Sequence, residues 1–297
     1  MRVTRGTTTT KTDYFLVEPS AVKILRVFPR RTAATPDDGM VRIGFPNLFP
    51  PECDEVHVSV TFTYDLPQAE KMAAAWRHIA PVKIGGPATG MAGGDFTPGL
   101  YLKPGYVITS RGCPNRCWFC MAAKREGDIR ELPITDGWNI LDNNLLACSE
   151  SHVLHVFQML TSQPRRAEFT GGLEASRVTP MVARMLVELN PRRIYFAYDT
   201  PDDWQPLVTA VDLLRQVGLP EFSHILSAYV LIGYPKDTIA EAAARLRFVL
   251  SLGVLPFAML YRDEAGKVDQ KWRRFQREWC RPTIVASRLN SIRPTSS

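Results

Sequence analysis

Three cysteines stand close together in this chain, in the segment Cys113-Pro-Asn-Arg-Cys117-Trp-Phe-Cys120. Their spacing is C-x3-C-x2-C, and they follow the strand-like run 106–109. Three thiolates on one short loop can hold three corners of a [4Fe–4S] cube, because cysteine thiolates are the usual ligands of such clusters. No fourth cysteine lies nearby in the sequence, so one iron would be left open for a substrate or cofactor.

A structural zinc site is the alternative for the same residues. Zinc takes four ligands, commonly as two C-x2-C pairs or as one such pair followed by two histidines. The remaining cysteines are scattered and form no second pair: Cys53, Cys148 and Cys280. The spacing therefore favours the iron–sulfur interpretation over zinc.

The wider segment 109–120, with the aromatic Phe119 just before the last cysteine, resembles the signature of the radical S-adenosylmethionine (radical SAM) enzymes. The resemblance implies that Cys113, Cys117 and Cys120 hold a [4Fe–4S] cluster whose free iron chelates the amino and carboxylate groups of S-adenosylmethionine. In this family the reduced cluster cleaves S-adenosylmethionine to methionine and a 5′-deoxyadenosyl radical, which abstracts hydrogen from a substrate. The resemblance also implies an external one-electron reductant such as flavodoxin or ferredoxin, and a backbone contact from Phe119 to adenine.

The elements that would position this loop alternate regularly over 104–263. Strands are expected at 104–109, 138–144, 167–174, 193–199, 227–235 and 254–261. Helices are expected between them, at about 150–161, 179–189, 204–217 and 239–252. Six βα units with buried strands predict an α/β fold with an open parallel (β/α)6 partial TIM-type barrel. The radical SAM resemblance implies the same fold.

The preceding segment, 21–103, predicts a small Rossmann-like domain, with strands at 24–28, 55–62 and 82–87 and a helix at 66–79. It resembles a shortened form of the cobalamin-binding domain that precedes the radical core in one branch of the family. The Asp-x-His-x-x-Gly motif that supplies the cobalt ligand is absent, and neither His57 nor His78 lies in such a context. We therefore expect a docking domain without cobalamin, and cobalamin-dependent radical methyl transfer is the alternative function.

Polar residues follow several of the expected strands, where ligands gather in parallel α/β folds. Asp142, Asn143 and Asn144 end the second strand, and their oxygens could accept hydrogen bonds from the ammonium group of S-adenosylmethionine. The other interpretation is a plain turn, since Asp and Asn favour turns.

Three further residues at strand ends are candidate cofactor ligands. Glu174, after two glycines, could bind a cofactor amine or the substrate, or could instead stabilise the entry of the next helix. Asp199 could accept from both hydroxyls of a ribose, or could cap the following helix. The resemblance implies that Gly233 and the apolar strand end before it form the adenine wall.

The composition of the chain bears on its solubility class and on its location in the cell. The chain is 45% hydrophobic and 22% charged, as expected for a globular protein, and no apolar run is long enough to span a bilayer. The start, residues 1–20, predicts a mobile tail without the apolar segment of a signal peptide, and 264–297 predicts a C-terminal helix and tail. We expect a cytoplasmic protein without a membrane partner.

The net charge of +6 permits an anionic partner. It favours a nucleotide or nucleic-acid base as the substrate over a peptide or small metabolite. From another class, a non-catalytic nucleic-acid-binding module stabilised by zinc or by a cluster remains the alternative.

Overall fold

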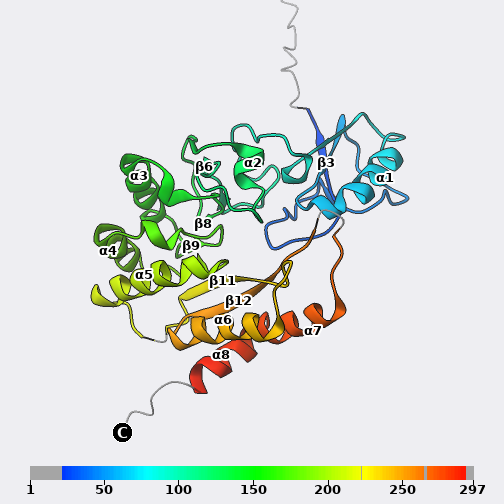
Figure 1. Ribbon diagram of the computed structural model, residues 1–297. Helices are drawn as coiled ribbons and strands as arrows, with labels where there is room; N and C mark the ends of the chain where they lie inside the picture. The colour runs from blue at the N-terminus through cyan, green and yellow to red at the C-terminus, as the bar shows by residue number, and fades with distance from the viewer. Residues whose placement is uncertain (1–21, 222, 264–265, 292–297) are drawn as a thin grey trace, which may run out of the picture.

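The computed structural model describes residues 22–221, 223–263 and 266–291 (Figure 1). These residues form a mixed α/β structure with two parallel sheets and a short antiparallel strand pair. The tail expected at 1–20 lies outside the described residues. Each parallel sheet has its own large cluster of buried apolar side chains.

The N-terminal sheet has four parallel strands in the order β2-β1-β3-β4. Their bounds are Ile24–Phe28 (β1), Val41–Ile43 (β2), Glu55–Ser59 (β3) and Val82–Gly85 (β4). Helix α1, Leu66–Trp76, connects β3 to β4 and buries Met72 and Trp76 in the core of this sheet. Its apolar positions recur at helical spacing and Pro67 lies in its first turn, so the sequence predicts it directly.

The second sheet has six parallel strands in the order β5-β8-β9-β10-β11-β12. Their bounds are Tyr106–Val107 (β5), Asn139–Ile140 (β8), Glu168–Phe169 (β9), Arg193–Ala197 (β10), Leu226–Ile232 (β11) and Leu255–Leu260 (β12). Each strand lies within or within one residue of an expected segment, but the strands are shorter. The polar residues predicted at the strand ends therefore lie in the loops that follow the strands.

Four helices connect these strands, at the positions that the sequence predicts. Their bounds are Glu150–Thr161 (α3), Pro180–Leu189 (α4), Trp204–Gln216 (α5) and Ile239–Ser251 (α6). The side chains of Ser149, Thr179 and Thr238 accept hydrogen bonds from the first turns of α3, α4 and α6, which explains where these helices begin. The helices follow one another around the outside of the six strands (Figure 1).

The chain ends in two helices, Gln270–Trp279 (α7) and Pro282–Ser291 (α8), rather than the single helix expected. On α7, Trp272, Phe275 and Trp279 recur at helical spacing and pack against the core of the six-stranded sheet. None of the helices in the described parts of the chain is long and apolar enough to cross a membrane.

The connection from β5 to β8 holds the cysteines. It contains the antiparallel pair Ser110–Arg111 (β6) and Arg130–Glu131 (β7), with helix α2, Ala122–Glu126, between them. Single 3-10 turns complete the structure: Thr63–Asp65 (η1), Pro87–Thr89 (η2), Leu145–Ala147 (η3), Ala175–Arg177 (η4) and Pro201–Asp203 (η5). Helix α2 lies between the N-terminal sheet and the six-stranded sheet (Figure 1).

Candidate functional site

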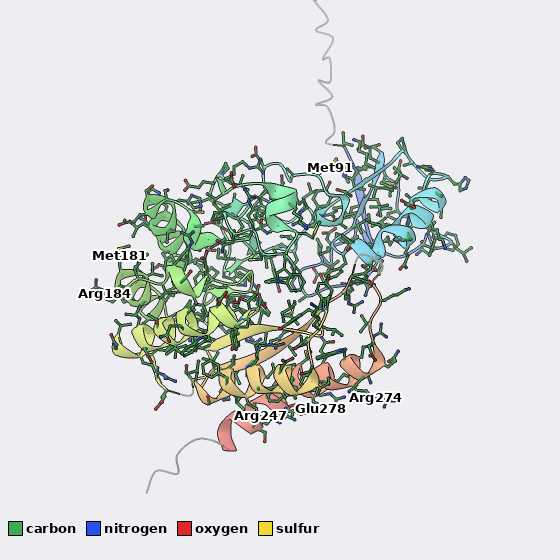
Figure 2. All side chains as sticks on the ribbon, in the orientation of Figure 1. Met91, Met181, Arg184, Arg247, Arg274 and Glu278 are labelled. Atoms are coloured by element: carbon green, nitrogen blue, oxygen red, sulfur yellow. The ribbon has the colours of Figure 1, made fainter. Side chains whose placement is uncertain are left out.

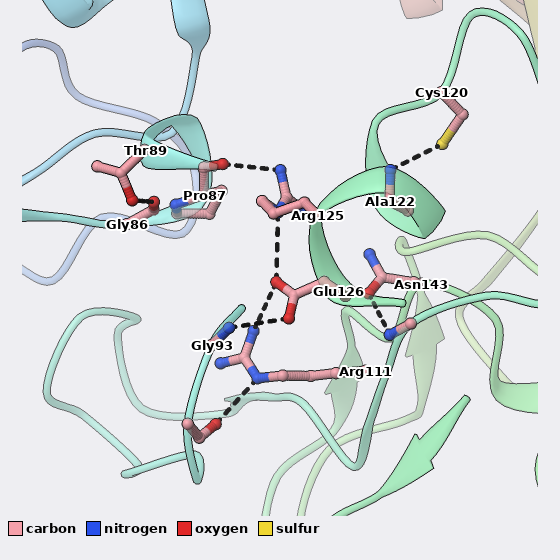
Figure 3. Close-up of polar contacts among 12 residues, drawn as sticks. Gly86, Pro87, Thr89, Gly93, Arg111, Cys120, Ala122, Arg125, Glu126 and Asn143 are labelled. Carbon is pink, nitrogen blue, oxygen red and sulfur yellow. Dashed lines mark hydrogen bonds and ion pairs between the residues drawn. The ribbon is translucent and has the colours of Figure 1, made fainter. Parts of the chain in front are cut away.

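The three cysteines lie on one loop, residues 112–121, between β6 and α2. We call it the cysteine loop. Gly112 begins it with φ +85°, and an added Cβ there would come within 2.1 Å of the carbonyl oxygen of Asp128. At the other end the amide of Ala122 donates to Sγ of Cys120 over 3.4 Å (Figure 3). Local geometry therefore fixes both ends of the loop.

The thiols of this loop are free and close enough to interact electrostatically. Cys113 is half-buried, whereas Cys117 and Cys120 are exposed. Burial raises the pKa of the Cys117 thiol, and the negative charges of Cys120 and Cys113 raise it further. A bound cation would reverse this effect, because a thiol that coordinates a metal gives up its proton.

No group of three or more His, Cys, Asp or Glu side chains among the described residues is arranged to hold a metal ion. The donor chemistry of the cysteine loop nevertheless fits a cluster with three protein ligands. Two of the other half-buried cysteines have surroundings of their own: Cys280 donates to the carbonyl oxygen of Ala258 over 3.1 Å, and burial raises the pKa of Cys148 to about 11. Neither presents a ready fourth thiolate.

Asp142 follows β8 and is buried, with only 1% of its surface exposed. One carboxylate oxygen accepts from the backbone amide of Thr109 over 2.7 Å. The other accepts from the hydroxyls of Thr109 and Ser110 over 2.6 and 2.7 Å. Burial raises the pKa of Asp142, and these hydrogen bonds act against the rise. The expectation that Asp142 meets the ammonium group does not agree with this geometry, because both oxygens already hold the strand that leads into the cysteine loop.

The two asparagines after Asp142 face different neighbours. Asn143 is exposed, and its Oδ1 accepts from the amide of Gly112 over 3.0 Å (Figure 3). Asn144 is buried, and its Nδ2 lies 2.6 Å from a Glu174 oxygen and 3.5 Å from Sγ of Cys113. Within the described residues Oδ1 of Asn144 has no hydrogen-bond partner. Buried acceptors normally have a donor, so Oδ1 of Asn144, beside a cysteine of the loop, is a candidate acceptor for a donor on a ligand.

Glu174 lies just beyond β9 and is held by its neighbours. Its carboxylate accepts from Asn144, from Ser176 over 2.7 Å and from Arg177 over 2.6 Å. Burial alone would raise the pKa of Glu174, but these hydrogen bonds outweigh it and lower the pKa below its usual value. Glu174 is therefore a carboxylate that orients Asn144. Of the two glycines before it, Gly171 serves packing, since a Cβ there would meet the backbone of Asp142 at 2.5 Å.

Asp199 follows β10, and the next turn is capped by Thr200, with Asp203 completing the capping box. Oδ2 of Asp203 accepts from the amides of Asp199 and Thr200 over 2.9 and 2.7 Å. The carboxylate of Asp199 accepts from the amide of Leu231 over 3.1 Å. Burial, and then the neighbouring charge of Asp203, raise the pKa of Asp199 to about 7. The negative charge of Asp199 also contributes, as one of the smaller causes, to the raised pKa of Cys117.

Gly233 lies directly after β11 and has φ +73°. A Cβ there would come within 2.9 Å of the Leu260 side chain and 3.0 Å of the Trp272 ring. Its amide donates to the buried carboxylate of Asp237 over 2.7 Å, and Asp237 in turn pairs with Arg245 over 2.8 Å. Glycine at this position lets α7 approach the end of β11, and Asp237 fixes the turn.

The sequence analysis did not single out Trp118, the residue before Phe119. Its indole ring is 52% exposed and contacts the rings of Phe119, Tyr234 and Tyr261, with centroids 5.3, 5.8 and 5.7 Å apart. Tyr234 follows β11 and Tyr261 follows β12, so the cysteine loop beyond β5 reaches the far edge of the six-stranded sheet. An aromatic residue between two loop cysteines was the available signal, but its partners lie more than 110 residues further along the chain.

Comparisons with protein-family models and with curated proteins found no match for this chain. The case for a function therefore rests on the sequence pattern and on the geometry of the site.

Proposed function

We propose that this protein is a radical SAM enzyme in which Cys113, Cys117 and Cys120 bind a [4Fe–4S] cluster. The observation that carries the proposal is the cysteine loop beside Asn144, whose buried Oδ1 has no partner among the described residues. The bound cluster would supply the electron that cleaves S-adenosylmethionine reductively to a 5′-deoxyadenosyl radical. The protein's own task is to bind the cofactor, exclude water and aim the radical at one C–H bond.

The amino group of S-adenosylmethionine is assigned to Asn144 rather than to Asp142. A carboxylate can only accept hydrogen bonds, so the Asn144 atom that faces Glu174 must be the amide nitrogen. This leaves the amide oxygen of Asn144 pointing away from Glu174, where it can accept from an ammonium group. Glu174 therefore acts as the positioning residue, and its negative charge adds a favourable electrostatic contribution.

The other strand ends would bind the nucleoside part of the cofactor. Asp199 is assigned to the ribose, because a carboxyl group with a pKa of about 7 can accept from one hydroxyl and, when protonated, donate to the other. Phe119 is assigned to adenine through its backbone, and Gly233 to the adenine wall. The aromatic cluster of Trp118, Tyr234 and Tyr261, of which Trp118 is exposed, would keep water from this side of the site.

The same cluster supports the proposal that the six-stranded sheet is the partial barrel of this family. Strands β5 and β12 are the two edges of the sheet, and Trp118 beyond β5 contacts Tyr261 beyond β12. A flat sheet of six strands would hold its edges about 24 Å apart, at about 4.8 Å per strand. Curvature toward closure would bring these two edges closer together and would account for the contact.

The alternative with cobalamin is disfavoured by the surroundings of His57. Nδ1 of His57 lies 2.5 Å from the Tyr101 hydroxyl, and Nε2 lies 2.9 Å from a Glu55 oxygen. Cobalt ligation would break one of these hydrogen bonds. The proposal further includes a cytoplasmic location, a flavodoxin or ferredoxin as the reductant, and a nucleotide or nucleic-acid base as the favoured substrate.

Anaerobic reconstitution with iron and sulfide tests the proposal. The radical SAM function requires about four irons per chain, a brown protein, and reductive cleavage of S-adenosylmethionine to 5′-deoxyadenosine. One tightly bound zinc without cleavage would instead identify the protein as a zinc-stabilised binding module, and the proposal would be abandoned.

A further inference from the structure

A cavity of about 610 Å³ lies between the two sheets, and no function has been assigned to it so far. Its walls come from the carboxyl ends of β1, β3 and β4 on one side and from the loops after β5 and β8 on the other. Most of the segment 91–102 forms a further wall. The volume lies in the range of small-molecule sites, about 300–1,000 Å³. The cavity does not include the cysteines, so it is distinct from the cofactor site.

One end of the cavity carries two arginine side chains beside a buried carboxylate. The carboxylate of Glu126, whose side chain is only 2% exposed, lies 3.6 Å from Arg111 and 3.3 Å from Arg125 (Figure 3). It also lies 3.9 Å from Arg130. Two of these three guanidinium groups, those of Arg111 and Arg125, belong to residues that line the cavity, as does the carboxylate of Asp95. The Arg111 and Arg125 side chains are each 17% exposed. Such half-buried arginines bind phosphate or carboxylate groups strongly.

The rest of the wall is largely apolar and aromatic. The side chains that form this part are Phe28, Phe62, Ile84, Phe96, Leu100 and Leu102. A ligand that fits both parts has an apolar or aromatic body and an anionic group at one end. A mononucleotide has this form, and its size suits the volume.

The backbone around the charged end is held tightly in place. The amide of Gly93 donates to Glu126 over 2.9 Å, and the carbonyl of Gly94 accepts from Arg111 over 3.0 Å. An added Cβ on Gly93 would overlap the guanidinium of Arg111, at 2.3 Å. Arg125 donates to the carbonyl of Pro87 in the N-terminal unit over 2.8 Å (Figure 3). The arginines are therefore preorganised, which lowers the entropy lost when an anion binds.

The cavity also adjoins the cofactor site. Helix α2 begins two residues after Cys120 and ends with Glu126. Asn143 lines the cavity, while the next residue, Asn144, contacts Cys113. A ligand in this cavity that contacts Asn143 would therefore touch the direct sequence neighbour of Asn144, the residue assigned to S-adenosylmethionine.

We propose that this cavity binds the substrate, and that the substrate is a free anion of mononucleotide size, with its phosphate or carboxylate on Arg111 and Arg125. Its identity as the substrate rests on the proposed radical SAM function, whereas binding itself does not. The segment 91–102 narrows the cavity on one side, and Arg26 fixes it by donating to the carbonyls of Gly99 and Leu100 over 3.1 and 2.9 Å. This wall favours a free small molecule over a base within a polynucleotide.

Calorimetric titration of the reconstituted full chain tests the proposal, with uridine 5′-monophosphate, cytidine 5′-monophosphate and their uncharged nucleosides as probes. At least one nucleotide should bind to a single site at least tenfold more tightly than its nucleoside. Arg125→Gln should weaken nucleotide binding at least tenfold, Arg125→Lys should restore part of it, and nucleoside binding should change less than twofold. Arg274→Gln, on α7 at a distance from the cavity, is the matched control and should change nothing (Figure 2).

A second pair of variants avoids the ion cluster altogether. Met91 lines the cavity and is 64% exposed, so Met91→Glu adds a negative charge there without burying it. It should weaken nucleotide binding severalfold and leave nucleoside binding unchanged. Met181→Glu makes the same change on α4, far from the cavity, and should have no effect (Figure 2).

The proposal is overturned if neither nucleotide is preferred over its nucleoside. It is also overturned if Arg125→Gln and Met91→Glu both bind the nucleotides like the wild type, or if a uridine oligonucleotide binds more tightly than the mononucleotides. Repeating the titration with Cys113, Cys117 and Cys120 all changed to Ala separates the two proposals. Nucleotide binding should persist there, so a failure of the cluster assignment would leave this result standing.

Discussion

Two substitutions after β8, Asp142→Ala and Asn144→Ala, should separate the stability of the fold from the binding of the cofactor. Asp142→Ala removes the acceptor of three hydrogen bonds from Thr109 and Ser110, both fully buried. The Thr109 amide left without a partner costs about 1–3 kcal/mol, and each hydroxyl bond adds about 0.5–1.5 kcal/mol. The free energy of unfolding should therefore fall by about 2–6 kcal/mol, a large part of the 5–15 kcal/mol typical of proteins.

Asn144→Ala should act mainly on the cofactor. Glu174 keeps its bonds to Ser176 and Arg177, so the loss of stability should stay near 1–2 kcal/mol. If Oδ1 of Asn144 accepts from the ammonium group, its loss removes a charge-assisted hydrogen bond of about 1.5–3 kcal/mol. The affinity for S-adenosylmethionine should then fall about tenfold to a hundredfold.

Urea unfolding and titration of the reconstituted variants with S-adenosylmethionine give the two readouts. Asp142→Asn is the matched control, because it keeps one acceptor for the Thr109 amide and presents its amide nitrogen to hydroxyls that can rotate to accept. It should lose less stability than Asp142→Ala. The reasoning is refuted if Asp142→Ala unfolds like the wild type yet loses S-adenosylmethionine, since the carboxylate would then belong to the cofactor site.

The remaining predictions concern metal, cobalamin and pH. Cys113→Ala, Cys117→Ala and Cys120→Ala should each abolish iron loading and cleavage, and loss of the cluster in Cys53→Ala, Cys148→Ala or Cys280→Ala would show that the ligands are misassigned. Hydroxocobalamin should bind weakly or not at all, and a stoichiometric cobalamin spectrum after purification would contradict this. The pKa of Asp199 is raised to about 7, so between about pH 4 and 7 the folded protein keeps a proton that the unfolded chain has lost. The free energy of unfolding should therefore fall as pH rises through this range, by up to about 4 kcal/mol. Urea unfolding of Asp199→Asn should show a flatter dependence, and an unchanged slope would exclude Asp199 as its source.

The sequence predicts the helices of this fold well because their signals are local. Helix α3 has the expected bounds, with Ser149 as its cap, and Gly253 with φ +68° ends the turn after α6. Strand β2 was not expected, since it has three residues, of which one, Val41, is buried, and it shows no alternation. The pair β6–β7 was missed for the same reason, with two residues in each strand.

The candidate site likewise has one part with a local sequence signal and another part that depends on contacts between distant segments. The cysteine spacing lies within eight residues, so it can be read from the sequence directly. The structural role of Asp142 cannot be predicted from the sequence in this way. Its hydrogen-bond partner Thr109 lies 33 residues earlier, and the two residues come together only when β5 pairs with β8. The role of Glu126 also depends on distant residues. Nothing in the neighbouring sequence distinguishes it from any other helical glutamate, but in the structure it accepts from Gly93 and pairs with Arg111 and Arg130.

The three consecutive residues Asp142, Asn143 and Asn144, after β8, each contact a different part of the structure. Asp142 turns into the core and holds Thr109, Asn143 faces the cavity between the sheets, and Asn144 faces Cys113 and Glu174. A rigid Asp142 therefore fixes the position of both asparagines relative to the cysteine loop. Any ligand that shifts Asn143 must strain the buried bonds of Asp142 or move the loop through Gly112. The proposed substrate cavity and the proposed cofactor site are thus linked by adjacent residues with little freedom to move, so a ligand bound at one should change binding at the other.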